Sequence, residues 1–328
     1  ADIVVLGFNA GDPGRYGRLV MQGDAVSRIV EYKDASEQER AITFCNSGVI
    51  CAKAEVLFSL LEVVGNDNAS GEYYLTDIVQ LANDRNLSVA AVHCDEAETM
   101  GINSRAELAQ AEASFQTRTR AEMMALGVSL TAPETVYFAY DTVLGRDSQI
   151  EPNVVFGPGV TVENSAHIRA FSHLEGCHVS SGAVVGPYAR LRFGTELAEN
   201  VRIGNFVELK NARIEDGAKV NHLSYIGDAN IGEASNVGAG TITCNYDGVG
   251  KHHTEIGASV FIGSNTMLVA PVTVGDEAMT ASGSVITKDV EPGALAIARS
   301  EQGNKPGLAI KLFAMLRRRK AKQQERML

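Results

Sequence analysis

Residues 179–209, VSSGAVVGPYARLRFGTELAENVRIGNFVEL, place an aliphatic residue at every sixth position. The same count extends on both sides with occasional slips of one residue, and glycine often follows the aliphatic residue directly. An α-helix repeats every 3.6 residues and a strand every two, so a period of six indicates short strands joined by tight corners. Such a ladder is typical of a parallel β-helix. Its members are Ile150, Phe156, Val162, Ile168, Leu174, Val179, Val185, Leu191, Leu197, Ile203, Leu209, Ile214, Val220, Ile226, Ile231, Val237, Ile256, Ile262, Leu268, Val274 and Ile286.

Three hexads make one coil of a triangular prism, so residues about 18 apart should stack on one face, one coil apart. About eight coils at ~4.8 Å spacing would give a prism roughly 35–40 Å long. The glycines and small residues beside the ladder suit the corners, where positive φ is tolerated without steric cost.

Composition limits the classes of partner. The 328 residues carry a formal net charge of −11, which argues against nucleic acid as the main partner and requires a local basic pocket for any anionic substrate. There is no apolar run long enough for a membrane span and no visible signal peptide. The five cysteines are scattered without a CxxC pair, so we expect the reduced thiols of a cytoplasmic protein.

The chain divides into four predicted segments. Residues 1–103 alternate strand-like and helix-like stretches, which predicts an α/β domain, and residues 104–127 predict a linking helix that begins with the capping pattern Ser104-x-x-Glu107. Residues 128–297 form the β-helix domain, and residues 298–328 form a tail with a helix and a basic end. The strand-like stretches are 1–8, 25–32, 41–52 and 87–94, and the helix-like stretches are 54–64 and 76–85.

Polar residues interrupt the ladder in a way that a scaffold does not need. Arg192 and Lys210 are 18 residues apart with no slip between them, so their side chains should stack one coil apart. Like charges at this spacing repel, which favours a shared anion such as a phosphate. The alternative is two independent solvated cations.

One slip further along, the spacing places Asn205 next to His222 and Glu208 next to Tyr225. A histidine close to a carboxylate and a pair of cations suits general-base catalysis at neutral pH. The alternative is a structural histidine bonded to a backbone carbonyl group.

Four segments carry a close resemblance to a known family: RLRFG (190–194), GNFVELKNAR (204–213), HLSYIGDANIG (222–232) and NVGAGTITCNYDG (236–248). They resemble the bacterial bifunctional N-acetylglucosamine-1-phosphate uridylyltransferase/glucosamine-1-phosphate N-acetyltransferase family. Residues 1–103 resemble the second half of its uridylyltransferase domain, a Rossmann-like nucleotidyltransferase domain, and GEYYLTD (71–77) is among the matches.

The resemblance implies a left-handed β-helix and acetyl transfer from acetyl-CoA to the amine of glucosamine 1-phosphate. The product would be N-acetylglucosamine 1-phosphate, on the way to UDP-N-acetylglucosamine for peptidoglycan and lipopolysaccharide. It also implies a cytoplasmic homotrimer with acetyltransferase sites between subunits, and no nucleic-acid or membrane partner.

The resemblance also implies roles for individual residues. His222 would be the catalytic base, with Glu208 orienting it and Asn245 lining the reacting centre. The glucosamine 1-phosphate would be held by Arg192, Lys210, Tyr225 and Asn236. Acetyl-CoA would be contacted by Ala239, Asn245, Tyr246, Ser264, Ser282 and Arg299; the family more often has Ala where this chain has Ser282. The remnant UDP-N-acetylglucosamine site would contain Gly17, Glu31, Asn46 and Asn103, and Asn103 would belong to an incomplete Mg²⁺ site.

One departure from the family pattern concerns the first domain. That domain begins with a glycine-rich loop followed by a basic residue, and it supplies an Asp that binds Mg²⁺ together with the residue matching Asn103. Residues 7–14, GFNAGDPG, do not match the loop. We therefore expect a chain that lacks the N-terminal part of this domain and the uridylyltransferase activity.

The sequence leaves other functions open. His173 and His178 have the spacing used by zinc sites of the γ-carbonic-anhydrase type, and His167 is nearby in the sequence. A β-helix can also be a non-catalytic binding module. Cys244 could be considered as an acyl-carrying nucleophile, although the sequence shows no evident general base beside it. The basic run from Arg317 to Lys320 fits either a solvated face or contact with an anionic ligand.

Overall fold

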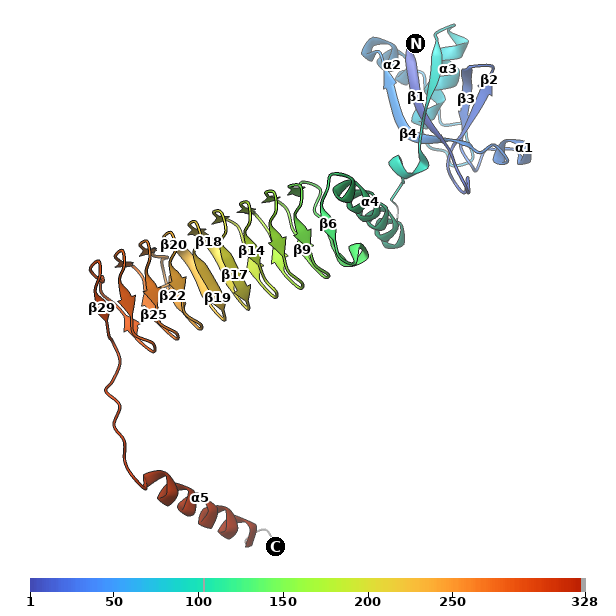
Figure 1. The fold of residues 1–328 in the computed structure, drawn as a ribbon. Helices are drawn as coiled ribbons and strands as arrows, with labels where there is room; N and C mark the ends of the chain where they lie inside the picture. Colours follow the sequence, from blue (N-terminus) through green and yellow to red (C-terminus); the bar gives the residue numbers. More distant parts are fainter. Residues whose placement is uncertain (103, 326–328) are drawn as a thin grey trace. The chain divides into compact units, whose positions relative to one another are not determined.

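The computed structural model describes residues 1–102 and 104–325. The chain divides into two compact units, Ala1–Arg118 and Thr119–Leu328 (Figure 1). The division falls inside α4 (Arg105–Ala125), which corresponds to the helix expected over 104–127. The Ser104 hydroxyl accepts a hydrogen bond from the Glu107 backbone N–H at 3.2 Å, as the capping pattern predicts.

The N-terminal unit is α/β, and its five strands close into a barrel in the order β1-β4-β2-β3-β5. β1 lies parallel to β5 and antiparallel to β4. α2 and α3 help to form the core with buried residues such as Leu60 and Ile78. The strands are β1 (Ile3–Asn9), β2 (Arg18–Gln22), β3 (Ala25–Val30), β4 (Phe44–Ala52) and β5 (Val89–Cys94), and the helices are α1 (Glu37–Arg40), α2 (Ala54–Leu61) and α3 (Ile78–Asp84), with short 3-10 turns at Leu75–Asp77 and Glu96–Glu98.

The sequence did not predict β2 or the closure of the barrel. The reason lies in Arg18, the first residue of β2, which is almost fully buried although it carries a charge. Its guanidinium donates hydrogen bonds to the backbone carbonyls of Pro13, Gly14 and Arg40 at 3.1–3.3 Å. A buried arginine that donates to backbone carbonyls does not fit the apolar alternation by which a strand is recognised.

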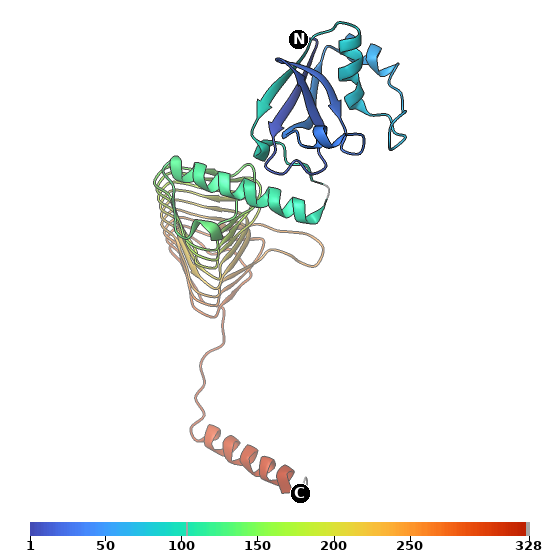
Figure 2. The same cartoon turned by 90° about the vertical axis from the view of Figure 1, so that its right-hand side faces the viewer.

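The C-terminal unit is a parallel β-helix, and its triangular cross-section is visible when the structure is viewed as in Figure 2. One face is a sheet with one strand per coil, and the strands of this sheet pair in parallel. α4 and the next residues close one end of the core, because Met123 and Val128 belong to the core cluster. This sheet contains β6 (Ser129–Leu130), β8 (Gln149–Ile150), β11 (His167–Ile168), β14 (Val184–Val185), β17 (Arg202–Asn205), β19 (Lys219–His222), β21 (Asn236–Val237), β24 (Phe261–Ile262), β27 (Met279–Thr280) and β29 (Leu295–Ala296).

A second sheet supplies the other two faces, and β18 (Glu208–Ile214) and β20 (Tyr225–Ile231) belong to both of them. These two strands bend at Asn211 and Asp228, whose φ angles are 46° and 50°. The remaining strands are β7 (Val143–Leu144), β9 (Val155–Phe156), β10 (Val160–Val162), β12 (His173–Leu174), β13 (Cys177–Val179), β15 (Arg190–Leu191), β16 (Thr195–Leu197), β22 (Ile242–Cys244), β23 (Thr254–Ile256), β25 (Met267–Val269), β26 (Val272–Val274) and β28 (Val285–Ile286).

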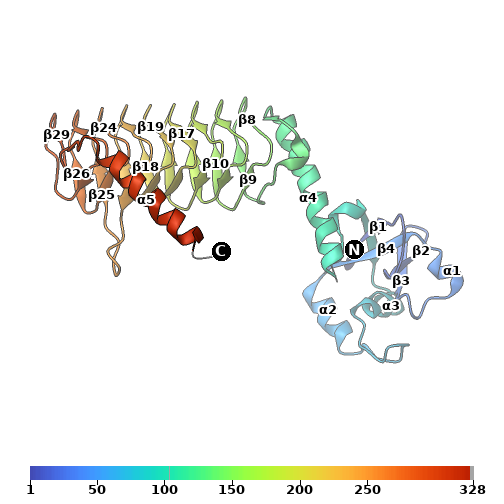
Figure 3. The ribbon, with the colours of Figure 1, turned by 90° about the horizontal axis from the view of Figure 1, so that it is seen from below.

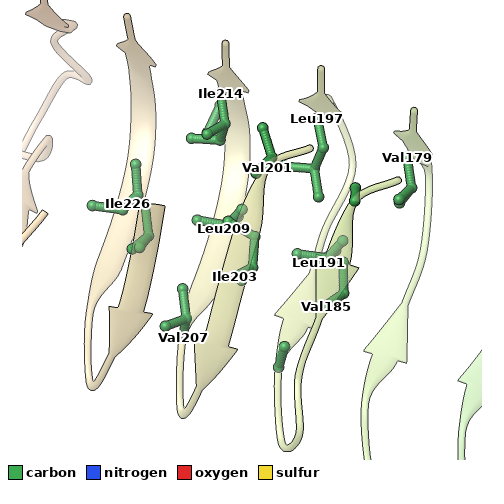
Figure 4. Close-up of a cluster of buried hydrophobic side chains, with 14 of the residues drawn as sticks. Val179, Val185, Leu191, Leu197, Val201, Ile203, Val207, Leu209, Ile214 and Ile226 are labelled. Atoms are coloured by element: carbon green, nitrogen blue, oxygen red, sulfur yellow. The ribbon is translucent and has the colours of Figure 1, made fainter. Parts of the chain in front are cut away.

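The ladder of sixes forms the core of the prism. Each ladder residue named from the sequence is at most 3% exposed, and Figure 4 shows Val179, Val185, Leu191 and Leu197 inside the coils. Burial of such a side chain contributes roughly 1.5–3 kcal/mol. Thr243 and Thr280 occupy two further inward positions and are also buried, which the sequence ladder omitted because they are polar.

One corner of the prism carries a row of large apolar side chains in the left-handed region of backbone space. Phe171, Tyr188, Phe206 and Leu223 have φ angles of 51–59° and are about half exposed. Their rings stack, with centroids 4.9 Å apart between Phe171 and Tyr188 and 5.3 Å apart between Tyr188 and Phe206. We call these four residues the aromatic edge. Bulky residues rarely adopt positive φ, so this row is strained and incompletely covered within one chain.

A hairpin interrupts the coils after β22, and Figure 3 shows it projecting from the prism. Tyr246 pairs with Lys251 across it, and the Asp247 carboxylate accepts hydrogen bonds from the backbone N–H groups of Val249 and Gly250. The last helix is α5 (Leu308–Glu325), whose described side chains are exposed. No helix among the described residues is long and apolar enough to span a membrane.

Candidate active site on the β-helix

His222 lies in a row of residues that runs along the prism axis, with one residue from each successive coil at the same corner. Asn205 pairs with His222, as the spacing of 17 residues predicts. The backbone continues the row, because Gly240 N–H donates to the His222 carbonyl, Asn265 N–H to that of Ala239 and Gly283 N–H to that of Ser264. The row therefore contains Asn205, His222, Ala239, Ser264 and Ser282. Arg299 lies beside its far end, because a Cβ on Gly283 would be 3.9 Å from the Arg299 Cδ.

The imidazole of His222 is exposed, and its Nδ1 lies 3.2 Å from the Asn205 Oδ1. An amide oxygen can only accept, so Nδ1–H donates this bond and the neutral form of the ring has its lone pair on Nε2. The Asn205 amide thus holds the ring in the tautomer that can accept a proton from a substrate. Sequence analysis assigned an orienting role to Glu208, whereas Asn205 makes the hydrogen bond to His222 within one chain.

The predicted phosphate-binding residues lie on the neighbouring face. Leu191 pairs with Leu209, which brings Arg192 and Lys210 to adjacent coils as predicted. Arg192 Nη1 lies 2.8 Å from the Glu208 Oε1, and Lys210 Nζ lies 3.9 Å from the Asp228 Oδ2. The side chains of Arg192 and Lys210 are 38% and 22% exposed, so both cations remain accessible to an anion.

The structure adds Lys251 to this group. Lys251 comes from the hairpin, and its ammonium group lies beside that of Lys210, whose proximity lowers the pKa of Lys251. Two adjacent ammonium groups repel each other unless an anion lies between them. Sequence analysis missed Lys251 because the hairpin breaks the 18-residue spacing. We call Arg192, Lys210 and Lys251 the basic cluster.

Tyr225, Gly227 and Asn245 pack against one another next to the basic cluster. Glu208 pairs with Tyr225 in the register that the sequence predicts. The Asn245 Nδ2 lies 3.5 Å from the Tyr225 hydroxyl and 2.5 Å from the Asp228 Oδ2. Gly227 leaves room for this arrangement, because a Cβ there would be 2.4 Å from the Tyr225 hydroxyl and 2.8 Å from the Asn245 Nδ2.

The aromatic edge separates these two groups within one chain. His222 ends β19 in one sheet, and Tyr225 begins β20 in the other, with Leu223 at the corner between them. Among the described residues, Asn205 is the polar side-chain partner of His222, and no residue of the basic cluster contacts it. One chain therefore presents the proposed base and the proposed phosphate-binding group on different faces.

The remaining predicted residues also have defined places. Asn236 is half-buried in β21, where it pairs with Lys219, and the exposed Tyr246 donates its hydroxyl proton to the Gly248 carbonyl at 2.6 Å. Burial raises the pKa of the Cys244 thiol, which disfavours the thiolate needed for an acyl-carrying nucleophile.

In the N-terminal unit, the predicted sugar-nucleotide residues lie together. The Asn46 N–H donates to the Gly17 carbonyl at 2.8 Å, and a Cβ on Gly17 would be 3.4 Å from the Glu31 Oε1. The Glu31 Oε1 also accepts a hydrogen bond from Thr76. Asn103, the predicted Mg²⁺ ligand, lies outside the described residues.

The histidines of the zinc alternative lie on three successive strands of the prism, β11, β12 and β13. His167 is 2.8 Å from Glu151, and His178 is 3.0 Å from Glu163 and 3.2 Å from Glu196. Within residues 1–102 and 104–325, no group of three His, Cys, Asp or Glu side chains is arranged to hold a metal ion. His167 and His178 thus contact carboxylates of neighbouring coils and do not share a ligand set.

Residues 253–288 match the bacterial transferase hexapeptide (six repeats) family. The chain is 72% identical over 321 residues to the bifunctional protein GlmU of Ruegeria sp. (strain TM1040). This alignment covers 98% of this chain and 72% of that protein. It is 65% identical to the bifunctional protein GlmU of Jannaschia sp. (strain CCS1), over 96% of this chain and 70% of that protein.

The chain belongs to the GlmU family. Among solved structures, the UDP-N-acetylglucosamine acyltransferase LpxA of Bacteroides fragilis aligns at 20% identity and a TM-score of 0.34, over 55% of this chain and 70% of that one. That of Francisella novicida aligns at 15% identity with the same TM-score, over 52% of this chain and 65% of that one. The assignment to GlmU depends on the sequence identity and not on these partial structural alignments.

Proposed function

We propose that this member of the GlmU family transfers the acetyl group of acetyl-CoA to the amine of glucosamine 1-phosphate. The product is N-acetylglucosamine 1-phosphate, which leads to UDP-N-acetylglucosamine. The observation that carries the proposal is the row headed by His222, in which an oriented imidazole with a free Nε2 stands in line with Ala239, Ser264 and Ser282.

The basic cluster supplies the specificity for a sugar phosphate. The whole chain is acidic, yet Arg192, Lys210 and Lys251 lie close together on one face, where Glu208 pairs with Arg192 and Asp228 lies near Lys210. A phosphate dianion would bind between these three cations through charge-assisted hydrogen bonds. Tyr225 and Asn236 would then contact the sugar ring.

Catalysis requires a neutral amine and a good leaving group. A sugar amine with a pKa near ~8 is mostly protonated at pH 7, so removal of a proton is needed for it to act as a nucleophile. The amine nitrogen attacks the thioester carbonyl carbon, a C–N bond forms and the C–S bond breaks. The proton that the nitrogen loses passes by way of His222 to the CoA thiolate, which leaves as a thiol. His222 accepts the proton that the amine loses, a contribution of typically ~10²–10⁴-fold.

Acetyl-CoA would lie along the row that continues from His222. Successive coils are ~4.8 Å apart, so a row of this kind suits an extended cofactor rather than a compact one. Small residues at Ala239, Ser264 and Ser282 leave space for the pantetheine arm, and Arg299 at the far end provides a cation for the CoA phosphates. Tyr246, on the projecting hairpin, would contact the same molecule.

The active unit is a homotrimer with each site formed between subunits. Two features support this assembly: the exposed, strained aromatic edge, and the placement of His222 and the basic cluster on either side of it. A second copy packed on this edge would cover the four apolar side chains. The His222 of one copy would then face the basic cluster of the other. Mixing two inactive variants, His222→Ala and Arg192→Ala, should therefore restore part of the activity, whereas each alone should not.

The proposed reaction is tested by the release of CoA thiol from acetyl-CoA in the presence of glucosamine 1-phosphate. Glucosamine without the phosphate tests the basic cluster, and N-acetylglucosamine 1-phosphate, which lacks a free amine, tests the nucleophile. We expect rapid release of CoA thiol with glucosamine 1-phosphate and not with the other two compounds. Absence of release with all three compounds would favour a non-catalytic β-helix module.

A further inference from the structure

Asp228 is a buried carboxylate that holds other side chains of the site. It lies at the bend of β20, is only 9% exposed, and adopts the left-handed conformation that Asp tolerates better than most residues. Its Oδ1 accepts a hydrogen bond from Asn211 Nδ2 at 2.7 Å, and its Oδ2 accepts one from Asn245 Nδ2 at 2.5 Å. Lys210 Nζ is 3.9 Å from the same Oδ2.

This carboxylate is ionised at neutral pH. Burial raises the pKa of Asp228, but the hydrogen bonds from Asn211 and Asn245 and the charges of Lys210 and Lys251 outweigh burial and bring the pKa below its ordinary value. An ionised carboxylate can only accept hydrogen bonds.

The orientation of the Asn245 amide follows from this charge. The NH₂ group must face Asp228, and it also lies 3.5 Å from the Tyr225 hydroxyl. The amide oxygen of Asn245 is therefore the atom left to meet a substrate. An amide oxygen held in this way accepts a hydrogen bond from a donor such as the sugar amine. It does not donate a hydrogen bond to the thioester oxyanion.

Two other aspartates of the prism have a purely structural role. Asp216 Oδ1 accepts from the Glu199 backbone N–H at 3.0 Å, and Asp276 Oδ1 accepts from the Ala258 backbone N–H at 2.8 Å. These aspartates cap corners of the coil. The hydrogen bonds to Asp228 come from side chains, and one of those side chains is Asn245, a predicted site residue.

We propose that Asp228 is a positioning residue for acetyl transfer: it fixes the Asn245 amide with its oxygen toward the substrate amine and keeps Lys210 beside Lys251. This inference rests on the proposed function, since it assigns a role within that reaction. Asp228 itself does not contact the reacting atoms.

The test compares Asp228→Asn with the matched variant Asp276→Asn. An Asn at position 228 presents an NH₂ group that competes with that of Asn245, so we expect kcat to fall about 10–100-fold, as for a misplaced catalytic group. The KM for glucosamine 1-phosphate should rise by no more than about threefold, because Lys210 loses the carboxylate that positions it while all three cations of the basic cluster remain to bind the phosphate. Asp276→Asn should leave both constants within about twofold.

A double variant distinguishes positioning from folding. In Asp228→Asn with Asn245→Asp, the donor and acceptor are exchanged, Asn211 can still donate to the oxygen of residue 228, and residue 245 again offers an oxygen to the substrate. We expect it to recover about tenfold in kcat over Asp228→Asn. Because the hydrogen bond is retained, this variant should fold even if Asp228→Asn does not, and a kcat within about tenfold of wild type then supports the positioning role, whereas a larger loss contradicts it.

The outcomes separate the two proposals. Wild-type kcat in folded Asp228→Asn, or no recovery in a folded double variant, would overturn the positioning role and leave acetyl transfer intact. If the wild-type chain transfers no acetyl group, the proposed function fails. Calorimetric binding of glucosamine 1-phosphate then decides the lysine part of the inference: weaker affinity in Asp228→Asn supports it, and affinity equal to or tighter than wild type contradicts it.

Discussion

Replacement of Gly227 by Ala tests how closely the sugar-binding residues are packed. The added Cβ would be 2.4 Å from the Tyr225 hydroxyl oxygen and 2.8 Å from the Asn245 Nδ2. Non-bonded carbon contacts are favourable near about 3.5 Å, so the Tyr225 hydroxyl must move by about 1 Å. A misplacement of this size in a catalytic site can cost about 10²-fold in rate. We therefore expect kcat/KM for glucosamine 1-phosphate to fall by about that factor.

The assay is CoA thiol release at varied glucosamine 1-phosphate, with Gly157→Ala as the matched control. A Cβ at Gly157 is also crowded, at 3.0 Å from the Glu175 Cβ, but this coil is distant from the basic cluster. Overpacking costs typically ~1–3 kcal/mol, so both variants should fold with lowered stability. Equal kcat/KM for Gly227→Ala and wild type would refute the packing described for Tyr225 and Asn245.

Three further predictions concern stability and assembly. Leu191→Ala removes a fully buried ladder residue and should lower the free energy of unfolding in urea by ~2–5 kcal/mol, whereas Arg190→Ala, an exposed neighbour, should cost less than about 1 kcal/mol; similar losses would contradict the ladder as the core. Phe206→Glu places a charge on the aromatic edge, so light scattering should show dissociation of the trimer together with loss of acetyl transfer; an unchanged mass would argue against this edge as the interface. The folded-state pKa of Asp228 is below its ordinary value, so its carboxylate stabilises the fold above about pH 5, and this contribution is lost as the pH falls through the lowered pKa; the difference in unfolding free energy between wild type and Asp228→Asn should shrink over that range, and a difference independent of pH would contradict the assignment.

The β-helix could be predicted from the sequence because its core repeats. One inward aliphatic side chain per hexad is enough to set the register, and that register in turn placed Asn205 beside His222 and Glu208 beside Tyr225. The N-terminal unit lacks such a repeat. There the buried guanidinium of Arg18 concealed β2, and the closure of the barrel depends on pairings that no local pattern shows.

The positions of the candidate site residues could be predicted where these residues follow the ladder, but not where they lie outside it. Lys251 reaches the basic cluster from a hairpin outside the repeat, so no spacing rule could place it. Asp228 could have been found, because it follows Asn211 by the 17 residues that separate neighbouring coils, and Asn211 donates to it. The separation of His222 from the basic cluster by the aromatic edge required the structure, because it depends on which sheet each strand joins.

The most direct test of the central claim is the rate of CoA thiol release from acetyl-CoA and glucosamine 1-phosphate for wild type and His222→Ala. The wild-type chain should release thiol at a rate that depends on glucosamine 1-phosphate, and loss of the base should lower kcat by about 10²–10⁴-fold with the fold intact. Equal rates for the two proteins would contradict His222 as the base that accepts the proton of the sugar amine.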